Sequence, residues 1–319
     1  MLYLLIFAAT LFLAYSNGAN DNFKGVATLY GSGALSYRQA VYLSTGATLA
    51  GALAALLLAG ALVKNFSGKG LVPDALLQQP AFAIAVAGGA ALTVLLATRI
   101  GMPVSTTHGL VGALVGAGLI AVGEQLNLDK LGKSFFLPLL ASPLLSAAAA
   151  FLVYSGARRF TTEESSPGPV ANSVHILSGG AVCFARALND APKIVGLLVL
   201  IQALDLRLGF VAVGLAMALG GWLNSQKIAE TMSRKITPLT HGQGLTANLI
   251  TSLLVSTASI SGLPVSTTHV SVGSLFGIAA ANRKVDAKVF RNILLSWVLT
   301  LPIAAAASAV LYFLLSQLQ

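Results

Sequence analysis

The sequence predicts an all-α polytopic membrane protein made of two homologous repeats with broken helices and re-entrant helical hairpins. Three observations support this class: a highly apolar composition, apolar stretches of bilayer-spanning length, and two polar motifs that each occur twice. Of the 319 residues, 56% are apolar and 9% are charged, whereas soluble domains carry about 25% charged residues. The mean hydropathy is +0.82. These values exclude a soluble enzyme.

The remaining composition narrows the class further. The 19 Lys and Arg residues exceed the 10 Asp and Glu residues and leave a formal charge of +9. In a membrane protein this excess is expected in loops on one side of the bilayer, so it does not indicate a nucleic-acid partner. The single cysteine, Cys183, excludes a disulfide framework and a cysteine-rich metal site. Glycines within apolar stretches predict closely packed helices.

The membrane segments follow from length, because about 20 apolar residues span a bilayer. The apolar N-terminal stretch has no basic region before it, so we expect a membrane helix and not a removable signal peptide. Polar residues interrupt the first and the fifth predicted segment. The predicted segments are 2–29, 40–63, 81–97, 134–154, 174–200, 208–223, 245–261 and 290–315.

An eight-residue block marks an internal duplication. Residues 101–108 recur as 262–269 with seven of eight positions identical, and both copies contain Pro-Val-Ser-Thr-Thr-His. The apolar segments that follow, 109–122 and 270–281, are short for a membrane span. A short segment opened by proline and polar residues is typical of a re-entrant or broken helix. Two re-entrant hairpins are therefore expected, one in each half.

A second motif repeats in the same order. Asn20-Asp21 is followed by Lys24, and Asn189-Asp190 is followed by Lys193. Internal duplication explains both pairs better than chance similarity. We divide the chain into a first transmembrane repeat (1–156), a hydrophilic linker (157–172) and a second transmembrane repeat (173–319), which together form one domain.

The orientation in the membrane is less well determined by the sequence. The linker carries Arg158 and Arg159, which favour the cytoplasmic side, although a solvated loop of either side would also accommodate them.

The charged residues within the apolar segments are the first candidates for function. An unpaired charge in a membrane helix costs about 3 kcal/mol, so each should face a cavity, a partner or an ion. Asp21 with Lys24, and Asp190 with Lys193, are three residues apart and could form structural ion pairs. Alternatively, each neighbouring asparagine and aspartate supplies hard oxygen ligands for a small cation, while the amide group is free to donate to an anion.

The Ser-Thr-Thr triplets are the second set of candidates. They lie where a half-helix begins, and a helix start offers unpaired N–H donors and the positive end of the helix dipole. We expect an anion site there, although local bonding of hydroxyls to the backbone is an alternative. The residues are Ser105, Thr106 and Thr107 in the first copy and Ser266, Thr267 and Thr268 in the second.

Three further polar residues have no assigned role. His108 and His269 could pack through hydrogen bonds or relay protons, and a metal site at the pair lacks a nearby cysteine or carboxylate. Glu230 could cap a loop or line the transport path.

These motifs together resemble the inorganic phosphate transporter (PiT) family of cation-coupled secondary transporters. Residues 18–21 and 188–193 are similar to the two family signatures, and the Pro-Val-Ser-Thr-Thr-His blocks are similar to its hairpin tips. The resemblance covers nearly the whole chain. It implies inverted repeats and a site near the midplane for the anion and for sodium or protons.

The resemblance implies specific site residues. The hydroxyl triplets and the asparagines would bind the anion with Lys24 and Lys193, and Asp21 and Asp190, with the asparagines, would hold the coupling cation. The anion-binding set is Asn20, Lys24, Ser105, Thr106, Thr107, Asn189, Lys193, Ser266, Thr267 and Thr268; the cation set is Asp21, Asp190, Asn20 and Asn189.

The sequence departs from the family pattern at the first motif. Family members commonly carry Val-Ala-Asn after the first Asn-Asp, where this chain has Asn22-Phe23-Lys24. Lys24 thus replaces an amide by a cation, which leaves the number of coupling cations open and also leaves the anion open between phosphate and sulfate.

We therefore expect a phosphate symporter in the cell (inner) membrane, with a monovalent cation, the lipid bilayer and a possible second copy as partners. It would have no resident cofactor and no enzyme activity. Alternatives are a sulfate or other tetrahedral-oxyanion permease and a passive anion channel. An intramembrane hydrolase using Ser105 or Ser266 with a nearby histidine is disfavoured, because the sequence has no GxSxG elbow.

Overall fold

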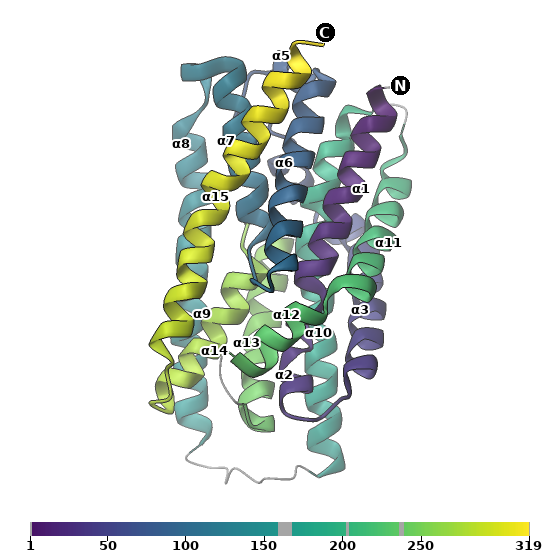
Figure 1. The fold of residues 1–319 in the computed structure, drawn as a ribbon. Helices are drawn as coiled ribbons and strands as arrows, with labels where there is room; N and C mark the ends of the chain where they lie inside the picture. The colour runs from purple at the N-terminus through teal and green to yellow at the C-terminus, as the bar shows by residue number, and fades with distance from the viewer. Residues whose placement is uncertain (1, 159–167, 202–203, 236–238, 319) are drawn as a thin grey trace.

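The computed structural model describes residues 2–158, 168–201, 204–235 and 239–318, and the regular secondary structure of these residues is helical (Figure 1). The first half contains α1 (Leu2–Asp21), α2 (Ala27–Gly31), α3 (Tyr37–Leu58), α4 (Gly60–Phe66), α5 (Asp74–Leu77), α6 (Pro80–Arg99), α7 (Thr106–Val122), α8 (Leu128–Leu131) and α9 (Leu137–Ala157). The second half contains α10 (Pro169–Val195), α11 (Leu206–Asn224), α12 (Gln226–Glu230), α13 (His241–Ile260), α14 (Thr267–Ala281) and α15 (Ala287–Ser316).

The helices follow the predicted membrane segments, with one difference in the place where a segment is interrupted. Among the described residues, seven helical segments are long and apolar enough to cross a bilayer. The interruption expected in the first segment is present, because α1 ends at Asp21 and a 3₁₀ turn, Asn22–Gly25, follows. In the fifth segment the helix continues through Asn189-Asp190 to Val195, and the 3₁₀ turn Gly196–Leu200 comes later. The two repeats are thus broken at different places.

The two hairpins enter the bundle from opposite ends. Figure 1 shows α6 and α7 reaching the interior from one end and α13 and α14 from the other. Segments 81–97 and 245–261, expected as separate spans, are the entering arms of these hairpins. The tips touch, because Thr268 Oγ1 donates to the Val104 carbonyl at 2.9 Å. The predicted re-entrant hairpins are therefore confirmed.

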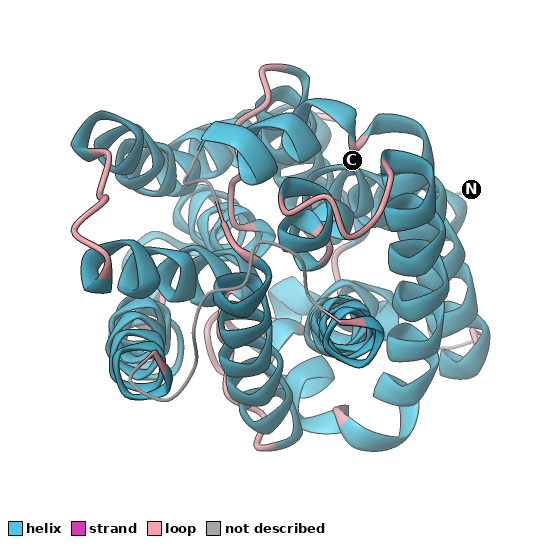
Figure 2. Cartoon of the chain, turned by 90° about the horizontal axis from the view of Figure 1, so that it is seen from below, coloured by secondary structure: helices cyan, strands magenta, loops and turns pink. Residues whose placement is uncertain are grey.

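The halves are inverted with respect to each other. The helices α1 and α10 run in opposite directions along the bundle, and so do α9 and α15 (Figure 1). Seen along the bundle in Figure 2, the helices lie at different tilts. Within the linker, Arg158 donates to the Ala281 carbonyl at 2.9 Å, whereas Arg159 and the rest of 159–167 lie outside the described residues.

Each hairpin rests on a helix of the other half. The returning arm α7 packs on α15, and α14 packs on α9. Glycines permit this close approach: a Cβ on Gly116 would lie 2.0 Å from the Ala305 carbonyl oxygen, and one on Gly277 would lie 2.1 Å from that of Ala147. The expected close packing through small residues is confirmed, and the repeats are intertwined.

The distribution of side chains suits a lipid environment. Leu57, Leu152 and Val298 are among many large apolar side chains that are more than half exposed. The largest fully buried side chains include those of Lys24, Lys193 and Arg186. Ordinary soluble proteins almost never bury such groups fully without a partner. The polar interior therefore requires a specific explanation.

Candidate functional site

The two Asn-Asp motifs meet beside the hairpin tips. The side-chain amide of Asn17 links them, because it donates to Asp21 Oδ2 (3.0 Å) and to Asp190 Oδ2 (3.1 Å). At the start of α7, Thr106 Oγ1 donates to Asp21 at 3.0 Å. All asparagines, aspartates and threonines of the expected site are at most 3% exposed. The sequence motifs thus form one buried polar centre.

Lys24 lies within a shell of oxygen atoms. Its Nζ donates to Asn20 Oδ1 (2.8 Å), to the Val104 carbonyl (2.7 Å) and to Thr268 Oγ1 (2.7 Å), and it forms an ion pair with Asp21. The 3₁₀ turn that ends α1 places Lys24 on the same side as the Asn-Asp pair. The ammonium therefore connects α1 with the tips of both hairpins.

Lys193 has an equivalent environment in the second repeat. Its Nζ donates to Thr107 Oγ1 and to the Val265 carbonyl, both at 2.7 Å, and lies 3.3 Å from Asp190 Oδ1. Thr107 belongs to the first repeat, so this lysine also bridges the halves. The two lysines are related by the same inversion that relates the repeats.

The asparagines fasten the hairpin tips. The amide of Asn20 donates to Thr98 Oγ1 (2.9 Å) and to the Met102 carbonyl (3.1 Å), and its oxygen accepts from the Val104 N–H (3.1 Å). The Asn189 amide donates to the Val265 carbonyl at 3.2 Å. Hydrogen bonds to backbone groups fix the non-helical tips, whose polar groups would otherwise be costly to bury. Positioning of the tips is thus one role of these residues.

Both serines of the hydroxyl triplets cap the following helix. Ser105 Oγ accepts from the His108 N–H at 3.1 Å, and Ser266 Oγ accepts from the His269 N–H at 3.2 Å. This is the local hydroxyl-to-backbone bonding considered from the sequence. The Ser266 hydroxyl still has its proton to donate, whereas the Ser105 hydroxyl also contacts His108 Nδ1 at 3.2 Å.

Two buried oxygen atoms of the expected site lack a hydrogen-bond partner within the part of the chain that the structure describes. They are Thr267 Oγ1 and Asn189 Oδ1, and both belong to the second repeat. The equivalent atoms of the first repeat, on Thr106 and Asn20, are bonded. Burial of an unpaired hydroxyl or amide oxygen costs about 1–3 kcal/mol, so such atoms are candidates to contact a ligand.

Arg186 is a further cation of the buried centre and was not predicted. It is fully buried and donates to Asn17 Oδ1 (2.9 Å), Asn22 Oδ1 (2.8 Å) and Thr48 Oγ1 (2.7 Å). Its NH1 lies 3.9 Å from Asp190 Oδ2. The guanidinium therefore orients the same Asn17 that links the two aspartates.

The formal charges of this centre do not cancel. Lys24, Lys193 and Arg186 contribute three positive charges, and Asp21 and Asp190 contribute two negative charges, which leaves +1. Burial of a net charge at low dielectric is expensive unless a counter-charge is bound. The arrangement therefore favours an anion as ligand.

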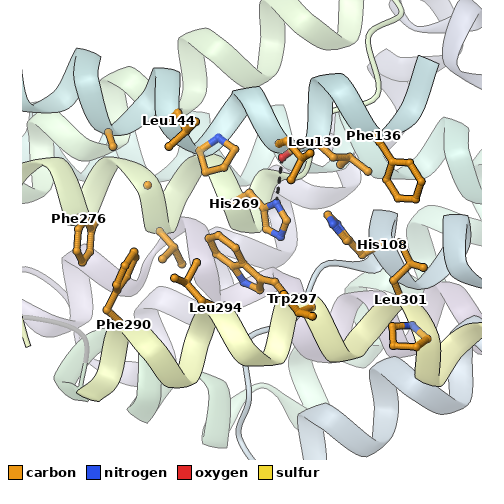
Figure 3. A pocket seen from close by; sticks show the side chains of 17 residues that line it. His108, Phe136, Leu139, Leu144, His269, Phe276, Phe290, Leu294, Trp297 and Leu301 are labelled. Atoms are coloured by element: carbon orange, nitrogen blue, oxygen red, sulfur yellow. Dashed lines mark hydrogen bonds between the residues drawn. The ribbon is translucent and has the colours of Figure 1, made fainter. Parts of the chain in front are cut away.

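The two motif histidines lie beside an apolar pocket of about 700 Å³ (Figure 3). Their rings are 4.4 Å apart between centroids, and the His269 ring stacks on Trp297 at 3.8 Å. His108 Nδ1 contacts Ser105 Oγ at 3.2 Å, and His269 Nδ1 contacts the Leu139 carbonyl at 3.4 Å. The pocket lining includes none of the five charged residues of the buried centre.

Comparison with known proteins identifies the family. A model of the phosphate transporter family matches residues 17–173 and again 163–308. The chain belongs to this phosphate transporter family. The two matches divide the chain as the internal duplication does, and the resemblance inferred from the motifs is confirmed.

The relatives within the phosphate transporter family are distant in sequence but match nearly all of this chain. The chain is 28% identical to the Bacillus subtilis "Probable low-affinity inorganic phosphate transporter", covering 100% of this chain and 98% of that protein. It is 28% identical to the Arabidopsis thaliana "Inorganic phosphate transporter 2-1, chloroplastic", covering 96% and 71%. A solved structure, "The sodium-dependent phosphate transporter", has 25% identity and a TM-score of 0.89 over 100% of both chains. The relatives are named as transporters and not as enzymes.

The sequence contained a signal for the two residues that were missed. Asn17 and Arg186 each lie three residues before the Asn-Asp motif, so they occupy the same position in the two repeats. Aligning the two repeats position by position, and not only where their residues are identical, would have placed Asn17 and Arg186 at one equivalent position. Glu230, whose role was open, is exposed at the end of α12 and contributes nothing to the buried centre.

Proposed function

We propose that the chain is a secondary active symporter that imports inorganic phosphate together with a cation across the cell (inner) membrane. The observation that carries the proposal is the buried centre of net charge +1, which both repeats build at the meeting point of their hairpin tips. Membership of the phosphate transporter family supports phosphate as the anion.

The proposed anion site lies between the starts of α7 and α14. Each helix start offers N–H donors and the positive end of its dipole, which suits a tetrahedral oxyanion. Thr267 and the serine hydroxyls would donate to the anion oxygens, and Lys24 and Lys193 would balance its charge. The unpartnered Thr267 Oγ1 supports this role.

Energetics require a cation to accompany the anion. Moving a divalent anion into a cell against about 100 mV costs about 4.6 kcal/mol, at about 2.3 kcal/mol per charge. Two or more monovalent cations per anion remove that electrical cost. Asp21 and Asp190 are the proposed positions for the coupling ion, with sodium and protons as the candidates. A channel needs no such carboxylates beside the anion path.

Alternating access would arise from rocking of one repeat-derived unit against the other. The hairpin tips would then separate from the opposite Asn-Asp motif on one side at a time. The contacts of Lys24 with Thr268 and of Lys193 with Thr107 are the ones that such a motion would break.

Phosphate and sulfate differ in a testable way. Phosphate keeps a proton near neutral pH and can donate to a carboxylate, whereas sulfate cannot. Uptake of labelled phosphate into proteoliposomes, with unlabelled sulfate in tenfold excess, tests the assignment. We expect little inhibition. Strong competition by sulfate would instead favour the sulfate permease, and uptake that ignores both sodium and proton gradients would favour the channel.

The assembly is a separate expectation. Two-fold symmetric dimers are the commonest homo-oligomers, so we propose that two copies of the chain form a homodimer in the membrane. Chemical cross-linking in native membranes, read as a shift to twice the monomer mass, would test it.

A further inference from the structure

Both buried lysines occupy positions that resemble cation-binding sites. The oxygen shell of Lys24 Nζ combines an amide oxygen, a backbone carbonyl and a hydroxyl at 2.7–2.8 Å with the Asp21 carboxylate. Carboxylate, carbonyl and hydroxyl oxygens are the ligands that hard metal cations prefer. The ligands come from α1 and from both hairpins, as expected for an ion that a closed transporter would hold.

The shell of Lys193 is similar by inversion but lacks the amide oxygen, because Asn189 Oδ1 has no hydrogen-bond partner among the described residues. A hydroxyl of the opposite repeat, a tip carbonyl of its own repeat and the Asp190 carboxylate surround Nζ. A structural ion pair alone would need only the aspartate three residues away. The additional carbonyl and hydroxyl contacts on both sides indicate that the ammonium itself is an integral part of the closed centre.

We propose that Lys24 and Lys193 act as tethered cations that fill the places a coupling sodium would otherwise take, so that this chain transports its anion without sodium. The proposal rests on the function proposed above and specifies its coupling ion. It contrasts the chain with the related solved structure, which is named a sodium-dependent phosphate transporter.

Electrostatics oppose sodium in these shells. Two unit charges 4 Å apart repel by about 4 kcal/mol at an effective dielectric of about 20, so a sodium ion beside either ammonium would be bound weakly. It would also raise the charge of a centre that is already +1. Conversely, one dihydrogen phosphate ion brings the centre to zero.

Tethered cations do not cross the membrane, which limits the possible driving ions. They offset the anion charge at the site, but the electrical cost of moving the anion remains. An ion that is released with the anion has to offset it. With both oxygen shells filled by ammonium groups, the proton is the expected companion, carried on the phosphate or on an aspartate.

The experiment has two independent readouts on the purified full chain. Thermal unfolding is compared in sodium chloride and in choline chloride at equal concentration, and phosphate uptake into proteoliposomes is compared in the same salts, with and without an inward proton gradient. We expect midpoints that agree in the two salts, uptake that agrees within twofold, and stimulation by the proton gradient. A sodium-specific rise of the midpoint, or uptake at least tenfold faster in sodium, would overturn the proposal.

Variants without the two ammonium groups test whether the emptied oxygen shells bind sodium. In Lys24→Asn/Lys193→Asn the oxygen shells are free, so sodium should raise the unfolding midpoint relative to choline. Lys133→Asn, at an exposed lysine paired with Asp129, is the matched control and should show no sodium effect. A double variant that folds without any sodium response counts against the proposal; if it does not fold, Lys193→Asn alone replaces it.

The two readouts separate the two proposals. Absence of phosphate uptake in both salts would contradict the proposed function. Equal midpoints of the unmodified chain in both salts would still support filled cation positions.

Discussion

The two repeats are nearly equivalent at the hairpin tips but differ one helical turn before each Asn-Asp motif. In the first repeat this position is Asn17, and in the second it is Arg186. The two side chains touch, since the arginine donates to the asparagine oxygen at 2.9 Å. The lysine–aspartate pairs cancel in both repeats, so Arg186 alone gives the centre its positive charge. Symmetry thus builds the site, and one departure from symmetry gives it a preference for anions.

Substitution of the two aspartates is expected to have the largest effects and tests the comparison of the two repeats. Removal of one partner from a buried ion pair costs about 3–5 kcal/mol because the other charge stays buried. Asp190 has two cationic partners and Asp21 has one within 4.0 Å among the described residues. Asp190→Asn should therefore lower the unfolding midpoint more than Asp21→Asn, and both should reduce phosphate uptake at least a hundredfold. Surface expression and uptake measured together check this, and near-normal transport in both variants would remove the aspartates from the coupling mechanism.

Arg186→Asn makes the two repeats alike and tests the source of anion preference. A unit charge roughly 10 Å from the anion is worth about 1.7 kcal/mol at an effective dielectric of about 20. The KM for phosphate should therefore rise at least tenfold, while Arg207→Asn, at an exposed arginine, should leave it unchanged. An unchanged KM in the folded Arg186 variant would show that the asymmetry does not serve anion binding.

The threonines that begin the two returning arms differ in their bonding. Thr106 Oγ1 donates to Asp21, and Thr267 Oγ1 has no hydrogen-bond partner among the residues that the structure describes. We expect Thr106→Val to lower stability by about 1–3 kcal/mol through the unsatisfied carboxylate. Thr267→Val should leave the unfolding midpoint unchanged and weaken phosphate affinity severalfold. The unfolding midpoint and the KM for phosphate are measured for both variants. An equal loss of phosphate affinity in the two variants would contradict the prediction.

Substitution of the two capping serines should have the smallest effects, and the effects of the two substitutions should be nearly equal. Ser105→Ala and Ser266→Ala each remove a helix cap, which costs about 1 kcal/mol. Each should also weaken phosphate affinity by a few fold, because a donor is lost. Unchanged KM in both variants, with lowered unfolding midpoints, would restrict the serines to capping.

The sequence predicted the architecture well because the duplication is explicit in it. The block at 101–108 and its copy at 262–269 located both hairpin tips, and the Asn-Asp motifs located the helices that meet them. Polar residues in the membrane interior are tolerated only where the protein buries them, because their exposure to lipid is costly. The motifs were therefore expected to meet inside the protein.

Contacts between residues far apart in the chain could not be predicted from the sequence. Lys24 and Lys193 each bond to a threonine on the hairpin of the opposite repeat, whereas spacing within one helix suggested only the local aspartate. The unequal helix breaks were also missed, because the same Asn-Asp letters end α1 but lie inside α10. There the tertiary packing of each repeat, and not its local sequence, determines where the helix ends.

The reciprocal seating of the hairpins has a consequence for biogenesis. The arm α7 is synthesised early, yet the helix on which it rests, α15, is made after every other helix described here. Until α15 enters the bilayer, the glycine-lined flank of α7 has no native neighbour, and α14 in turn requires α9 from the first half. Neither half can therefore complete its native helix contacts without the other.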